Sequence, residues 1–388
     1  MNKILTLNNI SVAGLEKLPR DNYEIASEIQ HPDAILLRSF KMHDMEIPVS
    51  LKAVGRAGTG VNNIPVDKMS KLGIPVFNAP GANANAVKEL VLAGMLLSCR
   101  HIGPAWQFAE DLQGTDAEIN KAVEAGKKQF GGFELPGKTL GVVGLGAIGR
   151  AVANMAETLG MNVIGFDPGM TVESAWKISS SVKQAASFDE MLSQVDFMTF
   201  HVPFIDVTKN MLNADRIKLL KKGATILNFA RGGIIDDAAM AEALKDGALY
   251  GYVNDFPNNT LKNIPNVVTL PHLGASTQDA EDNCAKIVAE NVRDSLENGN
   301  IKLSVNFPAV NMPRGEGVRV TIANSNVPNM VGQISSLLAD AGLNIVDMVN
   351  KSKGELAYTI VDVNDAVSDS VADAVRAIDG VLSVRVLG

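Results

Sequence analysis

An apolar run, a glycine-rich turn, a helical pattern and a second apolar run follow one another between Gly137 and Pro168, in the sequence GKTLGVVGLGAIGRAVANMAETLGMNVIGFDP. The turn is Gly144-Leu-Gly146-Ala-Ile-Gly149, and the second run ends on Asp167. A GxGxxG motif alone is a weak signal, but this one lies between a strand and a helix, with an acid about 20 residues further on. These contexts predict a dinucleotide-binding βαβ unit, with a merely tight βαβ turn as the alternative.

Each glycine of this turn has a separate expected role. Gly144 allows the tight turn, Gly146 lets a pyrophosphate approach the backbone, and Gly149 lets the helix pack closely on the strand. The helix N-terminus offers free N–H groups and the positive end of its dipole to the phosphates. The unit therefore predicts a site for a dinucleotide cofactor.

Asp167 indicates which dinucleotide is bound. A carboxylate at this point accepts hydrogen bonds from ribose hydroxyls and repels a 2′-phosphate, by about 4 kcal/mol per charge pair at about 4 Å and an effective dielectric of about 20. No arginine or lysine between Asp167 and Lys177 could receive that phosphate. NAD is therefore favoured over NADP. The alternative is that Asp167 only caps the Asp-Pro turn.

Composition excludes several classes of protein. The chain has 388 residues, so two or three domains are expected, and its net charge of −8 argues against binding nucleic acid or an anionic membrane. Cys99 and Cys284 lie in apolar helical patterns without a CxxC motif, which favours buried thiols over a disulfide or a metal site. The first residues lack a signal-peptide pattern, so we expect a cytoplasmic protein.

The chain alternates apolar runs and helical patterns, which predicts two Rossmann-like parallel α/β sheets followed by a third, smaller domain. The order of elements expected in that last domain is βαββαβ, the ferredoxin-like arrangement. Ser276 and Asp279 predict a capping box at the start of a long helix that follows the second sheet. The expected boundaries are 1–92 with 277–305 for the first domain, 93–276 for the dinucleotide-binding domain, 306–317 for a linker and 318–388 for the third domain.

Two cations follow strands of the first domain. Arg38 comes after an apolar run, and Arg56 leads into Gly58-Thr59-Gly60. Ligands of open α/β sheets bind beyond the carboxyl ends of the strands, so these residues are placed to meet an anion. Two solvated surface arginines are the alternative.

Three polar residues end successive strands of the dinucleotide-binding domain: Arg231, Asp255 and His272. Histidine is the natural acid–base group near neutral pH, and a guanidinium binds a carboxylate in bidentate fashion. Each residue alone could be structural: a turn arginine, a turn-capping acid and a loop histidine. His201 also ends a strand, on the segment that would flank the adenine half of the cofactor.

Four stretches together resemble the D-isomer-specific 2-hydroxyacid dehydrogenases. They are Gly55-Arg-Ala-Gly-Thr-Gly-Val-Asn-Asn63, Phe133-Glu-Leu-Pro-Gly-Lys138 continuing to Gly149, Phe229-Ala-Arg-Gly-Gly233 and Pro271-His-Leu-Gly-Ala-Ser-Thr277. The resemblance covers essentially the whole chain and is closest to the branch that oxidises D-3-phosphoglycerate at the start of serine synthesis. It implies NAD as cofactor, a substrate-binding first domain, an ACT domain at 318–388, and a homodimer or homotetramer.

The resemblance also implies roles for individual residues. Arg231 would bind the substrate carboxylate and polarise the carbonyl, and His272 would accept the proton in oxidation. The implied substrate contacts are Arg38, Ser39, Arg56, Gly58, Asn83, Arg231 and His272. The implied cofactor contacts are Thr59, Gly144, Gly146, Ala147, Ile148, Gly149, Asp167, His201, Val202, Pro203, Phe229, Ala230, Arg231, Asp255, His272, Gly274 and Ala275.

One position departs from the family pattern. The family pairs its histidine with a glutamate four or five residues after the position of Asp255, where this chain has Asn259 and Thr260. A carboxylate orients an imidazole and stabilises its cation. Its absence predicts a less fixed tautomer for His272, or another group in its place.

The last domain and the overall activity leave alternatives open. Asn326 and Asn344 resemble residues that bind serine between two ACT domains, and Asn324, the third candidate effector residue, stands where a histidine is often found. An ACT domain that serves only assembly is the alternative. The competing activities are a glyoxylate or hydroxypyruvate reductase, which needs no phosphate pocket, and a protein that senses NAD without catalysis. Retention of both Arg231 and His272 argues against the sensor.

Overall fold

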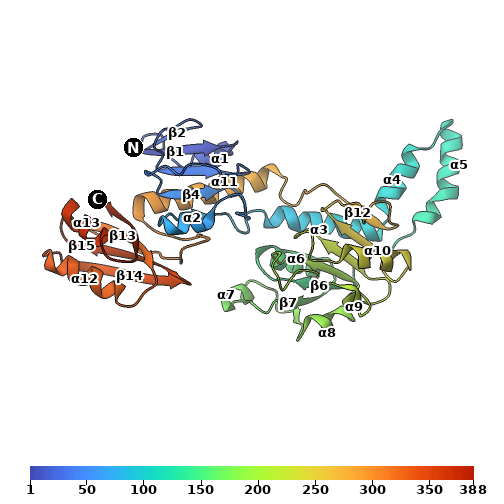
Figure 1. Ribbon diagram of the computed structural model, residues 1–388. Helices are drawn as coiled ribbons and strands as arrows, with labels where there is room; N and C mark the ends of the chain where they lie inside the picture. The colour runs from blue at the N-terminus through green and yellow to red at the C-terminus, as the bar shows by residue number, and fades with distance from the viewer. The chain divides into compact units, whose positions relative to one another are not determined.

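The computed structural model describes residues 1–388 except for the side chain of Glu173. The chain forms two compact units, Met1–Ala82 together with Gln278–Gly388, and Asn83–Thr277. The first unit contains the five-stranded and four-stranded sheets, and the second contains the seven-stranded sheet (Figure 1).

The five-stranded sheet of the first unit is parallel, in the order β2-β1-β3-β4-β5. Its strands are β1 (Asn2–Leu7), β2 (Tyr23–Ala26), β3 (Ala34–Leu37), β4 (Ala53–Arg56) and β5 (Val76–Phe77). Its helices are α1 (Val12–Leu15), α2 (Val66–Lys71) and α11 (Gln278–Asn298). β3 is apolar and buried at every position, as expected for a parallel strand covered on both faces.

Helix α11 packs on this sheet through a stripe of small and branched residues that includes Cys284, Ala285, Val288 and Val292. Gly55 in β4 permits the close approach, because a Cβ there would lie 2.8 Å from the Cγ2 atom of Val288. The helix begins at Gln278, so Ser276 lies too early to cap it, and the predicted capping box was wrong. The Ser276 hydroxyl instead donates to the carbonyl of His272 at 3.4 Å.

The seven-stranded sheet of the second unit is also parallel, in the order β12-β11-β10-β9-β6-β7-β8. Its strands are β6 (Thr139–Val143), β7 (Asn162–Phe166), β8 (Lys183–Gln184), β9 (Phe197–Phe200), β10 (Thr225–Asn228), β11 (Gly251–Asn254) and β12 (Val267–Thr269). Its helices are α3 (Ala84–Cys99), α4 (Ile102–Glu110), α5 (Asp116–Gly126), η1 (Lys127–Phe130), α6 (Ala147–Thr158), α7 (Val172–Ala175), α8 (Phe188–Leu192), α9 (Ala214–Ile217) and α10 (Asp237–Lys245). The order reverses at β6, whose turn to α6 is the glycine-rich motif.

The third sheet is antiparallel, in the order β14-β15-β13-β16. Its elements follow one another as β-α-β-β-α-β: β13 (Val318–Ser325), α12 (Met330–Asp340), β14 (Ile345–Lys353), β15 (Leu356–Val363), α13 (Asp369–Arg376) and β16 (Val381–Leu387). One face carries the apolar side chains that pack on α12 and α13, among them Val320, Ile322 and Val361. The other face contributes Ala323, Tyr358 and Ile360 to the core beneath α11.

Candidate active site

The glycine-rich turn has the geometry that a bound pyrophosphate requires. Gly144 has φ +85°, and a Cβ there would lie 2.6 Å from the carbonyl oxygen of His201. A Cβ on Gly149 would lie 1.9 Å from the carbonyl oxygen of Gly144. Gly146, in contrast, faces open space, since no heavy atom lies within 4 Å of a Cβ built there. The first N–H groups of α6 therefore face an open approach.

Asp167 lies directly after β7 and holds the glycine-rich turn. Its Oδ2 atom accepts the amide of Leu145 at 2.8 Å, and its Oδ1 atom accepts the amide of Gly169 at 2.9 Å. The carboxylate thus does cap its turn, as the alternative interpretation expected. Each carboxylate oxygen has a further lone pair, so the same group can still accept a ribose hydroxyl.

His201 and Val202 lie against the opposite side of the glycine-rich turn. The His201 amide donates to the carbonyl of Val143 at 2.8 Å, continuing the edge of β9. The ring Nε2 atom lies 3.1 Å from the Thr199 hydroxyl, whereas Nδ1 is buried without a partner among the described residues. Burial lowers the pKa of His201 to about 3, so the imidazole is neutral near pH 7.

The loop that carries Arg231 is organised by Asn228, the last residue of β10. Asn228 is buried, its Oδ1 atom accepts the amide of Ala230 at 3.1 Å, and its Nδ2 atom donates to the carbonyl of Arg231 at 2.9 Å. The guanidinium itself is exposed, with Nη1 donating to the Ala230 carbonyl at 2.6 Å. The asparagine therefore fixes the backbone and leaves the cation available to a ligand.

The loop that carries His272 is held by Asp255 at the end of β11. The Oδ2 atom of Asp255 accepts the amides of Leu273 and Gly274, each at 3.1 Å. Asp255 is fully buried, and its Oδ1 atom has no partner among the described residues. Burial raises the pKa of the Asp255 carboxyl, while the Gly274 amide and the charge of His272 oppose that rise. An orphaned acceptor at this depth fits an amide donor on a bound cofactor.

The exposed imidazole of His272 packs on Phe256, with the ring centroids 5.2 Å apart. The residues at the family's glutamate position, Asn259 and Thr260, are exposed. Their neighbour Asn258 donates to Asp237 at 2.9 Å, away from the histidine. The carboxylate whose charge interacts with His272 is thus that of Asp255.

The predicted anion site in the first unit brings Arg38 and Arg56 together. The Nε atom of Arg56 donates to the carbonyl of Arg38 at 3.1 Å, and the Asn63 amide donates to the same carbonyl at 3.2 Å. Gly58 leaves room for the Arg56 guanidinium, because a Cβ there would lie 2.2 Å from Nη1. The Nη1 atom of Arg38 forms an ion pair with Oε1 of Glu281 at 2.7 Å.

The remaining predicted residues are a substrate-side asparagine, Asn83, and the candidate effector asparagines of the third domain. Asn83 precedes α3 without a side-chain cap, and its Oδ1 atom is buried without a partner among the described residues. Asn324 and Asn326 line one small cavity of about 140 Å³ in the four-stranded sheet. Asn344 is not among the residues that line that cavity, and its backbone N–H donates to Oδ1 of Asn364 at 2.9 Å.

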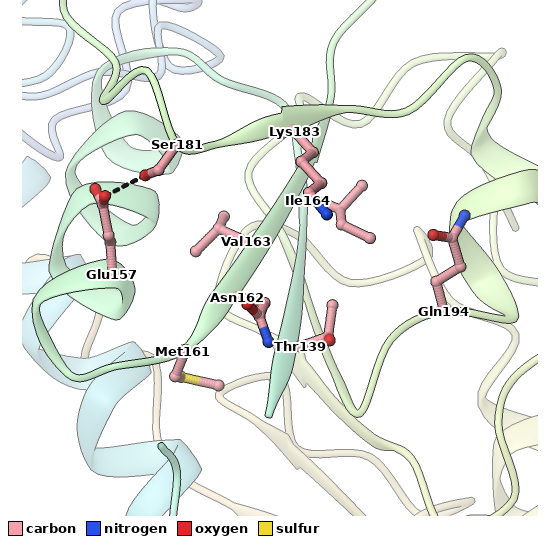
Figure 2. A pocket seen from close by; sticks show the side chains of 9 residues that line it. All are labelled: Thr139, Glu157, Met161, Asn162, Val163, Ile164, Ser181, Lys183 and Gln194. Atoms are coloured by element: carbon pink, nitrogen blue, oxygen red, sulfur yellow. Dashed lines mark hydrogen bonds between the residues drawn. The ribbon is translucent and has the colours of Figure 1, made fainter. Parts of the chain in front are cut away.

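A further hollow of about 310 Å³ lies at the amino ends of β6 and β7, beside Thr139 and Asn162. Figure 2 shows Ser181 bonded to Glu157 on one side of this hollow and Lys183 on another. The glycine-rich turn follows the carboxyl end of β6, so the hollow lies at the opposite end of the sheet. It is therefore separate from the candidate cofactor site.

Sequence reasoning missed three residues that build these loops. Asn228, Asn254 and Glu281 were given no role. Asn254 is buried, donates to Thr269 at 3.2 Å and accepts the amide of Phe256 at 3.0 Å. The signal for both asparagines was their place at the last position of a buried strand, whereas Glu281 had no local signal.

Within the part of the chain that is described, no cluster of three or more histidine, cysteine, aspartate or glutamate residues is suited to hold a metal ion. The same residues contain no helix that is long and apolar enough to cross a membrane. Cys99 and Cys284 are both free and buried.

Comparison with known proteins identifies the family. Residues 93–274 match the family model described as D-isomer specific 2-hydroxyacid dehydrogenase, NAD binding domain. The D-3-phosphoglycerate dehydrogenase of Haemophilus influenzae is 34% identical over 382 residues, which cover 95% of this chain and 89% of that protein. The chain belongs to the D-isomer specific 2-hydroxyacid dehydrogenase family.

Two further relatives agree with this assignment. The D-3-phosphoglycerate dehydrogenase of Methanocaldococcus jannaschii is 36% identical, over 87% of this chain and 63% of its own length. The crystal structure of a glyoxylate reductase from Paecilomyes thermophila has a TM-score of 0.63 at 25% identity, covering 78% of this chain and 98% of that one. This family member is an NAD-dependent dehydrogenase, which confirms the predicted family, cofactor and enzyme class.

Proposed function

We propose that this dehydrogenase oxidises D-3-phosphoglycerate to 3-phosphohydroxypyruvate with NAD, the first step of L-serine synthesis. The observation that carries the proposal is the pair of cations, Arg38 and Arg56, at the carboxyl ends of β3 and β4. A phosphorylated 2-hydroxy acid needs cations for its phosphate besides the one that binds its carboxylate. The names of the relatives from Haemophilus influenzae and Methanocaldococcus jannaschii support the same substrate.

Arg231 and His272 would carry the chemistry. The exposed guanidinium of Arg231 would hold the substrate carboxylate and polarise the carbonyl that forms at C2. The imidazole of His272 would take the proton of the C2 hydroxyl in oxidation and return it in reduction. NAD, when bound, supplies the acceptor for the C2 hydride.

The residues around the glycine-rich turn would hold the cofactor. Asp167 would accept hydrogen bonds from the adenosine ribose hydroxyls, and the backbone amides of Ala147 and Ile148 would donate to the pyrophosphate. Asp255 would accept a hydrogen bond from the carboxamide N–H of the nicotinamide. The remaining proposed contacts are Thr59, His201, Val202, Pro203, Phe229, Ala230, Gly274 and Ala275. Ser39 and Gly58 are further proposed substrate contacts. Asn83, whose buried Oδ1 atom is unpartnered among the described residues, is another.

We also propose the division of labour along the chain. Residues 1–92 with 277–305 would bind substrate, 93–276 would bind NAD, and 306–317 would link them to an ACT domain at 318–388. The β-α-β-β-α-β order of its elements and the cavity beside Asn324 and Asn326 support this reading. L-Serine would bind between two ACT domains of a homodimer or homotetramer, contacting Asn324 and Asn326 at this cavity and Asn344 outside it.

The decisive experiment follows NADH formation from NAD with D-3-phosphoglycerate and, separately, with unphosphorylated D-glycerate. We expect kcat/KM for D-3-phosphoglycerate to be at least about 100-fold higher than for D-glycerate, because D-glycerate has no phosphate group for the two arginines to bind. Equal rates on the two substrates would instead support a broad hydroxypyruvate or glyoxylate reductase. Adding L-serine to the same assay tests the effector site.

A matched pair of histidine variants tests the chemistry. His272→Asn removes the proposed acid–base group and should lower kcat by about 100- to 10,000-fold. His31→Asn changes an exposed histidine at φ +54°, a conformation that asparagine also tolerates, and should leave kcat unchanged. Similar loss of kcat in both variants would contradict the assignment.

A further inference from the structure

Glu281 introduces a negative charge into the proposed phosphate site. It lies in the first turn of α11, and its Oε1 atom is 2.7 Å from the Nη1 atom of Arg38 at the end of β3. The two side chains are 37% and 39% exposed, so a ligand from solvent can reach the pair. A negative charge in the first turn of a helix interacts favourably with the positive end of the helix dipole.

The charges of Arg38, Arg56 and Glu281 all act on one buried group of the first unit, the Cys284 thiol. Cys284, one turn further along α11, is buried beneath them, and its pKa is raised by burial, lowered by Arg38 and Arg56, and raised by Glu281. The carboxylate of Glu281 thus offsets part of the positive charge that Arg38 and Arg56 bring to this site. An anion that binds Arg38 must either displace Glu281 or lie beside it.

We propose that Glu281 tunes the affinity of the phosphate site: its carboxylate occupies Arg38 until a phosphate group displaces it. This inference rests on the proposed oxidation of a phosphorylated 2-hydroxy acid. A phosphate dianion meets both guanidinium groups and can replace the carboxylate, whereas a monoanion gains too little from Arg38 to do so. Glu281 thereby weakens the binding of every anion that reaches Arg38, and its presence lets the phosphorylated substrate and product leave quickly.

The test replaces the carboxylate by an isosteric amide. In Glu281→Gln, the KM for D-3-phosphoglycerate and the inhibition constant of inorganic phosphate should both fall about fivefold at low salt, the upper range for an exposed ion pair. Both effects should shrink in 0.3 M salt, because salt screens exposed charges. The KM for unphosphorylated D-glycerate should not change. The control is Glu290→Gln, which removes a comparable exposed carboxylate of α11 that pairs with Lys17. It should change none of these values.

The outcomes separate this inference from the proposed function. A higher KM in Glu281→Gln would mean that Glu281 holds Arg38 in place for the substrate, and an unchanged KM would mean that the pair has no role; either result overturns the inference. Calorimetry of the NAD-loaded wild type with D-3-phosphoglycerate provides the second measurement. A wild type that neither binds nor oxidises this compound would contradict the proposed function itself.

Discussion

Single polar side chains at strand ends hold the loops that carry the chemistry. Asn228, Asn254 and Asp255 are all buried, and each accepts backbone amides of the loop that follows or faces it. Removing one of these acceptors would cost more free energy of unfolding than the net gain from a hydrogen bond, because a buried amide left without a partner costs about 1–3 kcal/mol. The exposed side chains of Arg231 and His272 are therefore presented by backbone that buried side chains have fixed.

His201 makes stability depend on pH. Its pKa is lowered by burial to about 3, from an ordinary value of 6.5. Between these values the unfolded chain binds a proton that the folded chain does not, so the free energy of unfolding falls as the pH falls from 6.5. The slope contributed by this residue is at most about 1.4 kcal/mol per pH unit, and it vanishes above pH 6.5.

The variant His201→Asn removes this proton uptake and keeps a polar side chain beside Thr199. Denaturant unfolding of both proteins at pH 7.5, 6, 5 and 4 isolates the contribution as the difference between the two curves, because other groups titrate equally in both. We expect the variant to lose less stability than the wild type between pH 6 and 4. Parallel curves over that range would show that the imidazole titrates normally in the folded protein.

The turn from β6 to α6 separates a glycine needed for the fold from one needed for the ligand. A Cβ on Gly149 would meet the carbonyl oxygen of Gly144 at 1.9 Å, whereas a Cβ on Gly146 would meet no protein atom within 4 Å. Gly146 also has φ −63°, which any residue can adopt. The two positions therefore differ in what an added methyl group disturbs.

We predict that Gly146→Ala unfolds at the same temperature as the wild type but binds NAD at least about tenfold more weakly, because the methyl group occupies the approach to the backbone. Gly149→Ala should lose about 1–3 kcal/mol of stability as the turn shifts, and NAD affinity with it. Thermal unfolding without cofactor and calorimetric titration with NAD check both. Wild-type NAD affinity in Gly146→Ala would exclude this turn as the pyrophosphate site.

The elements with strong local patterns were predictable, and those defined by distant partners were not. β6, α6 and β7 follow directly from apolar runs and glycine positions. The short edge strands β2 and β8 were missed because neither has an apolar run: both residues of β8 are exposed, and only Tyr23 is buried in β2. They gain strand structure by pairing with β1 and β7. The pairing of Arg38 with Glu281 also has no local pattern, since it depends on where α11 packs on the sheet.

The C-terminal sheet is joined to the parallel sheet of its unit through polar groups as well as apolar ones. The buried Arg319 guanidinium pairs with both oxygens of Asp362 at 2.7 Å and donates to the carbonyls of Asn298, Met312 and Pro313. Arg385 donates to the carbonyls of Ser295 and Leu296. The last turn of α11 has carbonyls without intrahelical donors, and two arginines of the third sheet donate to this end of the helix, where the Ser295 carbonyl also accepts the amide of Gly299 at 3.0 Å.

Arg319→Met therefore tests whether the two sheets of this unit are stabilised together. The change leaves Asp362 buried without its cation and the carbonyls without donors, which should cost about 3–5 kcal/mol in the free energy of unfolding. The double variant Arg319→Met with Asp362→Leu removes the stranded charge and should recover part of that loss. Arg376→Met, which breaks an exposed pair with Asp373, is the matched control and should cost less than about 1 kcal/mol. If Arg319→Met is no more destabilising than this control, the C-terminal sheet does not depend on the buried pair.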